Sequence, residues 1–446
     1  MEISKKHRLG LRAAIGMLCA LFVLNSCLNK EYTTVETSDN ATVLSLKFDE
    51  NDSIPHLDEA EFIIDNDNNL IYNKDSLPYQ TRIDSVFPSF TFASTAGAAL
   101  IVDGDTMYLT GNDTVDFTVQ PVKLINYASD GIHFKEYDIY VNVHQVEPEL
   151  FVWTQLCEAV YQHEGSSQKA LQKDGAFYVL VSSGLKNYLY VSEDASQWQA
   201  HAVEGLPQNM DFRQALVFNG KFYVASAGKL YASDNASVWN ETSHSDYEFV
   251  NLLYVFNDEL WAVVRNVQTG AITFAGSRDA QTWMEGVALP EKFPMSDYAA
   301  FTFESRTGKA KAMVMGGITA EGVVCNTRWC TEDGSLWVDY SVEQPEFGSL
   351  SGAAVVYYAD RLLMFGGVDA NNQLFEGPVL ESYDEGLHWA TPDTTLNKLP
   401  DTYAVRTNQS AFVYGTSIYL FGGRTRTQVF SDMWKGKLNK MDFSQQ

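Results

Sequence analysis

The chain has 446 residues and a formal net charge of −26 at pH 7, because 57 acidic side chains outnumber 31 basic ones. So acidic a surface repels phosphate backbones, which excludes nucleic acid as an expected partner. The length accommodates two domains with full cores. The five cysteines have no regular spacing, so they do not form a disulfide framework.

Residues 1–27 have the pattern of an export signal, with a basic start and an apolar core of 12 residues from Ala13 to Leu24. That core is too short to span a bilayer, which takes about 20 residues. The following Leu-Asn-Ser-Cys ends at Cys27 and resembles a bacterial lipobox, in which the cysteine is lipidated and becomes the new N-terminus. We therefore expect a lipoprotein signal peptide and a membrane anchor on Cys27. The alternative is an ordinary cleaved signal followed by an incidental cysteine.

Residues 28–40 are polar and featureless, and they are expected to be a tether. From residue 41 to 147 the pattern is that of short alternating strands, predicted at 42–48, 62–64, 70–72, 115–119 and 137–143. A turn at Ser129-Asp130-Gly131 predicts a hairpin. Six to eight short strands in this length favour a β-sandwich of immunoglobulin-like size.

Residues 150–446 contain repeats. Five tryptophans end short blocks that open with Ser or Thr and carry Asp close behind, and they lie 41, 44, 54 and 52 residues apart. A period of about 40–50 residues built of short strands is the sequence pattern of a β-propeller with one blade per repeat. The five tryptophans are Trp198, Trp239, Trp283, Trp337 and Trp389.

The repeats also agree in their turns and second strands. Six tight turns, such as Asp174-Gly175 and Asn219-Gly220, each precede an apolar strand such as AFYVLVSS or KFYVASAG. Six turns predict six blades, four strands to a blade, with the tryptophan on the fourth. The sixth repeat has only three strands, so we expect residues 151–156 to supply its fourth strand, with Trp153 in the place of the other tryptophans. The predicted fold is thus all-β: an immunoglobulin-like β-sandwich followed by a six-bladed β-propeller closed by strand 151–156.

Two sequence features resemble known propeller families. The double-glycine strands that end at Gly317, Gly367 and Gly423 resemble kelch repeats, and the block Ser382–Trp389 resembles the Asp-box of sialidase-like propellers. The whole arrangement is similar to a family of uncharacterised Bacteroidales lipoproteins with a domain of unknown function. That resemblance implies an outer-membrane anchor in a glycan-degrading bacterium.

We find no catalytic, metal-binding or cofactor-binding pattern. The Arg-Ile-Pro element of sialidases is missing, and Arg82-Ile83-Asp84 lies in the other domain. The propeller histidines do not recur at one loop position with a Tyr partner, which argues against a galactose-oxidase-like copper site. Each Asp of the tryptophan blocks is expected to cap its own turn, with the Trp packed between blades. Carboxylate pairs have no diagnostic weight in so acidic a chain.

In the absence of a catalytic pattern we expect a binding surface on the loops around the channel, because their aromatic and hydrogen-bonding side chains suit sugars or peptides. The long insertions at 316–326, 366–378 and 390–409 are further candidates. The predicted ligand-binding residues are Tyr161, Phe212, Arg213, Arg265, Tyr298, Tyr403, Arg406 and Arg424.

We therefore expect an outer-membrane lipoprotein, on either side of that membrane, that binds a glycan or an envelope protein without catalysis. The first alternative is a carbohydrate-active hydrolase or lyase with carboxylates at the channel mouth. The second is a scaffold subunit of an outer-membrane complex with no small ligand.

Overall fold

The structure, a computed structural model, describes residues 37–439 except 52, 55, 56, 148, 243, 343–346, 378 and 392–395. Cys27, the predicted signal peptide and most of the predicted tether lie outside the described residues. The chain divides into two compact units between Gln145 and Val146. None of the described helices is long and apolar enough to cross a membrane.

The described residues of the N-terminal unit contain eight strands and one short 3-10 helix, Leu57–Glu59. Strands β1 and β4 form one antiparallel pair, and the other six form a sheet in the order β2-β3-β8-β7-β5-β6, in which β3 and β8 are parallel. The alternating pattern of these strands directs apolar side chains into one core that includes Leu46, Ile71 and Ile139. The strands are β1 (Val43–Phe48), β2 (Phe62–Asp65), β3 (Leu70–Asn73), β4 (Pro88–Phe92), β5 (Gly97–Val102), β6 (Asp105–Tyr108), β7 (Val122–Tyr127) and β8 (Phe134–Tyr140).

The structure confirms the hairpin predicted in this unit and contradicts one predicted strand. The hairpin around Ser129-Asp130-Gly131 is present as the β7–β8 connection. The strand predicted at 115–119 is wrong, because only an isolated bridge between Val86 and Val115 forms there. Val115 and Phe117 are nevertheless fully buried, so their alternation reflects core packing without a strand partner.

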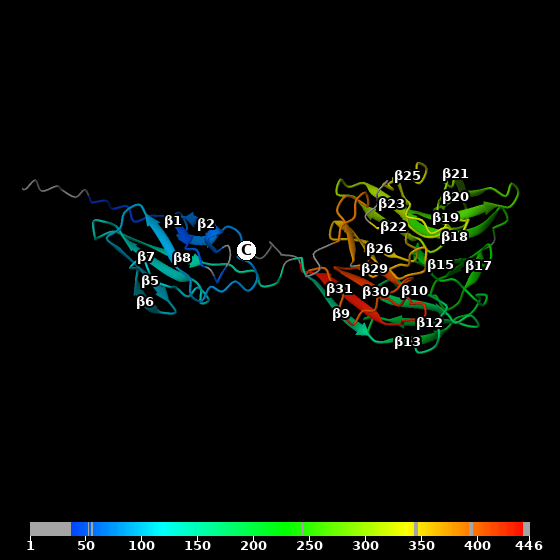
Figure 1. Ribbon diagram of the computed structural model, residues 1–446, viewed down its shortest axis with the longest axis horizontal. Coiled ribbons are helices and arrows are strands. Elements are labelled where there is room, and N and C mark those ends of the chain that lie inside the picture. The colour runs from blue at the N-terminus through cyan, green and yellow to red at the C-terminus, as the bar shows by residue number, and fades with distance from the viewer. Residues whose placement is uncertain are drawn as a thin grey trace, which may run out of the picture. The chain divides into compact units, whose positions relative to one another are not determined.

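The C-terminal unit is a set of six sheets, which we number in chain order (Figure 1). The first to third sheets are β10 (Ser167–Lys173), β11 (Ala176–Ser182), β12 (Asn187–Ser192) and β13 (Gln199–Ala202); β14 (Leu216–Phe218), β15 (Lys221–Ser226), β16 (Lys229–Ser233) and β17 (Asn240–Thr242); and β18 (Tyr247–Phe256), β19 (Glu259–Asn266), β20 (Ile272–Ser277) and β21 (Met284–Ala288).

The fourth to sixth sheets are β22 (Ala299–Glu304), β23 (Ala310–Met315), β24 (Arg328–Thr331) and β25 (Val338–Asp339); β26 (Ala354–Tyr358), β27 (Arg361–Phe365) and β28 (Leu380–Ser382); and β29 (Ser410–Tyr414), β30 (Ser417–Phe421) and β31 (Met433–Leu438) with β9 (Phe151–Cys157). The predicted pairing of strand 151–156 with the last repeat is therefore observed, as β9 lies antiparallel to β31. The fifth sheet has three strands where four were expected, and a single bridge between Glu381 and Ala390 stands in place of the fourth.

Six apolar clusters hold these sheets together. Five of them join residues of consecutive sheets, and the sixth joins the last sheet to the first, for example Phe421 with Val179. Each sheet is thus covered on both faces, which explains why second strands such as β27 and β30 are buried at every position. The first strand of the sixth sheet, β29, also contacts the first strand of the first sheet, β10.

The tryptophan blocks cap turns, as their sequence predicted. The Asp279 carboxylate accepts hydrogen bonds from the backbone N–H groups of Gln281 and Thr282, at 2.8 and 2.7 Å. In the second block the capping residue is Asn235, and the neighbouring Asp234 does not occupy that place. The tryptophans were expected on the fourth strands, but Trp198 and its counterparts precede them. A tryptophan just before the strand fills the gap between two sheets, and Trp239 is only 2% exposed.

Candidate functional site

The six first strands surround a cavity of about 490 Å³, and every sheet contributes residues to its lining. Because the first strand lies at one edge of each sheet and lines this cavity, the cavity lies between the six sheets, and we call it the central channel. A smaller recess of about 110 Å³ shares Gln168, Arg213 and Asn408 with it and adds Arg424. We call the shared region the channel mouth.

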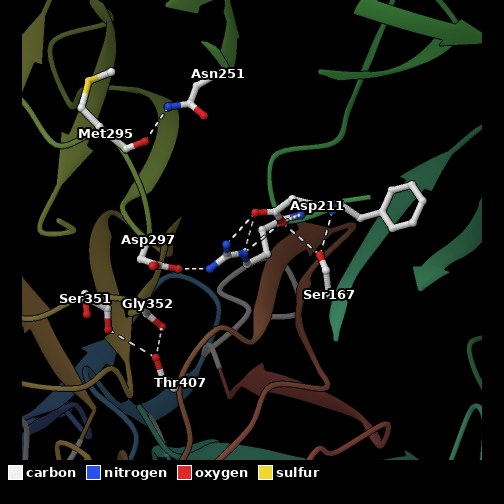
Figure 2. A network of polar contacts seen from close by, with 10 residues as sticks. Ser167, Asp211, Asn251, Met295, Asp297, Ser351, Gly352 and Thr407 are labelled. Atoms are coloured by element: carbon white, nitrogen blue, oxygen red, sulfur yellow. Dashed lines mark hydrogen bonds and ion pairs between the residues drawn. The ribbon is translucent and has the colours of Figure 1, made fainter. Parts of the chain in front are cut away.

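An arginine between two aspartates dominates the channel mouth (Figure 2). The Arg213 guanidinium forms a two-pronged ion pair with Asp211, with Nε–Oδ1 at 2.9 Å and Nη2–Oδ2 at 2.5 Å, and a second ion pair with Asp297. Ser167 donates a hydrogen bond to Asp211 at 3.0 Å, so four residues from the first, second and fourth sheets are joined. Burial opposes ionisation of Asp211, but the hydrogen bonds and charge of Arg213 outweigh it and lower the pKa of that carboxyl.

Three residues that precede first strands are linked through their backbones. Asp297, Gly352 and Asn408 have φ angles of 52°, 66° and 55°, in the left-handed region that Gly, Asn and Asp tolerate best. The Gly352 N–H donates to the Asp297 carbonyl at 2.6 Å, and the Asn408 N–H donates to the Gly352 carbonyl at 2.8 Å. Thr407 adds a side-chain hydrogen bond to the Gly352 carbonyl at 3.2 Å (Figure 2). This rigid chain of contacts fixes the Asp297 and Asn408 side chains at the channel mouth.

Further along the channel, Lys169 lies on β10, two residues after Ser167, so the two side chains share one side of the strand. Its ammonium group forms no ion pair or hydrogen bond with any residue that the structure describes. Burial lowers the pKa of Lys169 to about 8, although the charge of Asp211 acts in the opposite direction. Nearby in the lining, the Oε1 atom of Gln214 is a buried acceptor without a hydrogen-bond donor in the described chain.

Of the eight predicted ligand-binding residues, Arg213 and Tyr298 line the cavity and Arg424 lines the adjoining recess. Tyr298 is deeply enclosed there, and burial raises its pKa above the usual range. Arg424 is exposed, and none of the described side chains pairs with its guanidinium. Arg265 is exposed on β19 beside Glu248, at 3.6 Å, and does not line the channel.

The other four predicted residues are buried between sheets. Phe212 is fully buried, and Tyr161 and Tyr403 donate hydrogen bonds to Gln168 and Gln409. Arg406 is 1% exposed and forms a two-pronged ion pair with Asp432. These four side chains hold neighbouring sheets together, so we do not include them in the candidate site.

The long insertions contribute little to the channel. Among their described residues, only Asn408 and Gln409, at the end of the segment 390–409, line the main cavity. The paired glycines allow neighbouring sheets to pack closely, because a Cβ on Gly366 would lie 2.0 Å from the Arg406 carbonyl oxygen. Apart from Asn408 and Gln409, the described residues of the insertions therefore lie outside the lining of the main cavity.

Sequence reasoning missed Lys169, Asp211, Gln214, Asp297 and Asn408, all of which line the cavity. Their shared signal is position, since each lies within the first strand of a repeat or just before it. Position in the repeat would therefore have predicted these five residues, whereas the search for aromatic side chains did not. No cluster of three His, Cys, Asp or Glu side chains suited to a metal ion occurs in the described part of the chain.

No curated protein matches the chain. A solved structure titled "Structure of YjhT" is similar over 65% of this chain and 98% of that one, with 13% sequence identity and a TM-score of 0.45. Two family models match, the DUF6242 N-terminal domain over residues 28–141 and the DUF6242 beta propeller domain over residues 147–446. The C-terminal unit is therefore a β-propeller, and the chain belongs to the DUF6242 family, a family of unknown function.

Proposed function

We propose that this protein is a lipid-anchored binding protein of the cell envelope whose six-bladed, kelch-like propeller takes part of a glycan into the mouth of its central channel. The immunoglobulin-like domain acts as a spacer between the propeller and a lipid on Cys27. The lipobox-like sequence supports the anchor, and the similarity to Bacteroidales lipoproteins supports an outer-membrane location.

The observation that carries the proposal is the polar lining of the cavity. Its volume of about 490 Å³ falls within the range of about 300–1,000 Å³ that small-molecule sites occupy. Polar side chains from different repeats line it, including Arg213, Gln214 and Asn408. Because a rigid ring of strands holds these groups, little ordering of side chains opposes ligand binding.

The same geometry disfavours a glycosidase. That chemistry needs one carboxyl group with a raised pKa to act as the general acid. Asp211 and Asp297 are the carboxylates in the lining, and both are held by Arg213, which lowers the pKa of Asp211. An acid that is ionised well below neutral pH cannot protonate a leaving group.

Binding is tested with a glycan panel on the purified protein and on the variant Asn408→Gly. This variant removes an amide from the channel mouth, while glycine retains the positive φ angle of the residue. We expect it to weaken binding about three- to tenfold, the effect of losing one or two hydrogen bonds. The matched control Asn257→Gly makes the same change in the β18–β19 turn, where φ is 52° and the residue does not line the cavity, and should bind normally.

Other outcomes would redirect the proposal. Turnover of any glycan in the panel would establish an enzyme. No glycan binding, together with co-purification of an outer-membrane protein, would favour a scaffold subunit. The anchor is tested separately, because Cys27→Ser should abolish incorporation of radiolabelled palmitate.

A further inference from the structure

The basic side chains that line the channel differ in whether they form ion pairs. The two cavities together contain Lys169, Arg213 and Arg424 as bases and Asp211 and Asp297 as acids. Arg213 is occupied by both aspartates, at the opposite ends of its guanidinium group. Lys169 and Arg424 are left without a carboxylate among the described residues. The lining therefore carries one excess positive charge in a protein whose net charge is −26.

Lys169 is the more informative of the two, because it is enclosed. Burial of the ammonium group in the channel disfavours its charged form and lowers the pKa of Lys169, although the charge of Asp211 acts in the opposite direction. The acid whose charge acts on it, Asp211, forms no ion pair with Lys169, because its oxygens are directed to Arg213 and Ser167. A group of this kind is satisfied when a ligand brings the missing negative charge.

A second orphaned atom indicates the rest of the ligand. The Gln214 side chain lines the same cavity beside the Tyr298 hydroxyl, and its buried Oε1 atom accepts no hydrogen bond within the described chain. An acceptor of this kind pairs with a hydroxyl group, and Asn408 at the mouth offers both a donor and an acceptor. A ligand that places a carboxylate on Lys169 and hydroxyl groups on Gln214 and Asn408 is an acidic sugar.

We propose that the channel binds an acidic monosaccharide unit, with its carboxylate on Lys169 and its hydroxyl groups on Gln214 and Asn408. This inference rests on the proposed function, since it names the class of glycan that the channel mouth recognises. Arg424, exposed at the rim of the same opening, attracts the approaching anion and sets the orientation in which it enters.

The test is a calorimetric titration with matched sugar pairs. Glucuronate and galacturonate differ from glucose and galactose only by a carboxylate in place of a hydroxymethyl group. We expect the uronates to bind about ten- to a hundredfold more tightly, the effect of one charge-assisted hydrogen bond. Digalacturonate, titrated in parallel, distinguishes a free monosaccharide from the end of a chain.

Three variants test whether Lys169 causes the preference for uronates. Lys169→Met should remove the preference for uronates, whereas Lys169→Arg should retain it at pH 7. Lys221→Met is the matched control, because Lys221 is exposed at the β14–β15 turn and pairs with Asp234. It should bind as the wild type does.

Each remaining outcome has a distinct meaning. Equal binding of uronates and neutral sugars, or a uronate preference that survives Lys169→Met, would overturn the inference and leave the proposed function standing. Binding of neutral sugars only would do the same. Binding of no sugar at all would overturn both.

Discussion

Replacing Lys169 with methionine is expected to stabilise the propeller at neutral pH. Burial lowers the pKa of Lys169 from 10.5 to about 8, so the charged amine is less stable in the native protein than in the unfolded chain. Each pKa unit corresponds to about 1.4 kcal/mol, which gives about 3 kcal/mol below pH 8. Partial exposure of the side chain reduces the expected gain to about 1–3 kcal/mol.

The size of the stabilisation depends on pH, whereas its sign does not. Between pH 8 and 10.5 the unfolded chain binds more protons than the native protein, so wild-type stability rises with pH in this window. The advantage of methionine is therefore fully present below pH 8 and falls to about 1 kcal/mol by pH 9.5. The pKa of Asp211 is lowered and those of Arg213 and Tyr298 are raised, so these three neighbours do not change their protonation state in this window.

Tryptophan fluorescence is a suitable probe, because all nine tryptophans lie between Trp153 and Trp434, within the propeller. Urea unfolding of the wild type, Lys169→Met and the control Lys221→Met would be compared at pH 7 and pH 9.5. The expected result is a more stable Lys169→Met protein at pH 7 and a smaller difference at pH 9.5. A destabilised variant, or a gain of equal size at both pH values, would refute the reasoning.

Three further predictions concern the architecture. Arg406→Met should cost about 3–5 kcal/mol in urea unfolding, because it leaves the buried Asp432 carboxylate without its ion pair. Gly436→Ala should cost about 1–3 kcal/mol in the same assay, because a Cβ there would lie 2.6 Å from the Trp153 ring where β31 pairs with β9. Asp279→Asn should flatten the acid end of the stability curve. Backbone hydrogen bonds lower the pKa of Asp279 from 3.8 to about 2, so its contribution is present above pH 3.8 and is lost as pH falls toward 2.

The controls follow from the same contacts. Gly348→Ala should be nearly neutral, because no atom of the described residues lies within 4 Å of the Cβ it would add. An Arg406→Met protein as stable as the wild type would show that the ion pair with Asp432 is not needed. A wild-type unfolding midpoint for Gly436→Ala would show that Trp153 moves aside freely. For Asp279→Asn, a difference from wild type that persists at pH 2 would contradict the proposed cause.

The sequence by itself determined the local elements of the propeller. Tight turns such as Asn219-Gly220 and the apolar second strands depend on residues next to one another, so their pattern is legible in one dimension. The pairing of β9 with β31 was also predictable, because a repeat that lacks one strand must obtain it elsewhere. The strand at 115–119 failed, because alternating burial there arises from the core and not from a neighbouring strand.

Only the tertiary structure decided which polar side chains meet. Arg213 and Asp297 are 84 residues apart, and their contact depends on how two first strands approach across the channel. Arg406 and Arg213 look alike in sequence, yet one is sealed against Asp432 and the other opens on the cavity. No sequence motif marks Lys169. Its pKa is lowered because it is buried in the channel, and the two acids that line the channel, Asp211 and Asp297, form their ion pairs with Arg213. Residue type sets what a side chain can do, but its burial and its partners come from segments that the chain brings together only on folding.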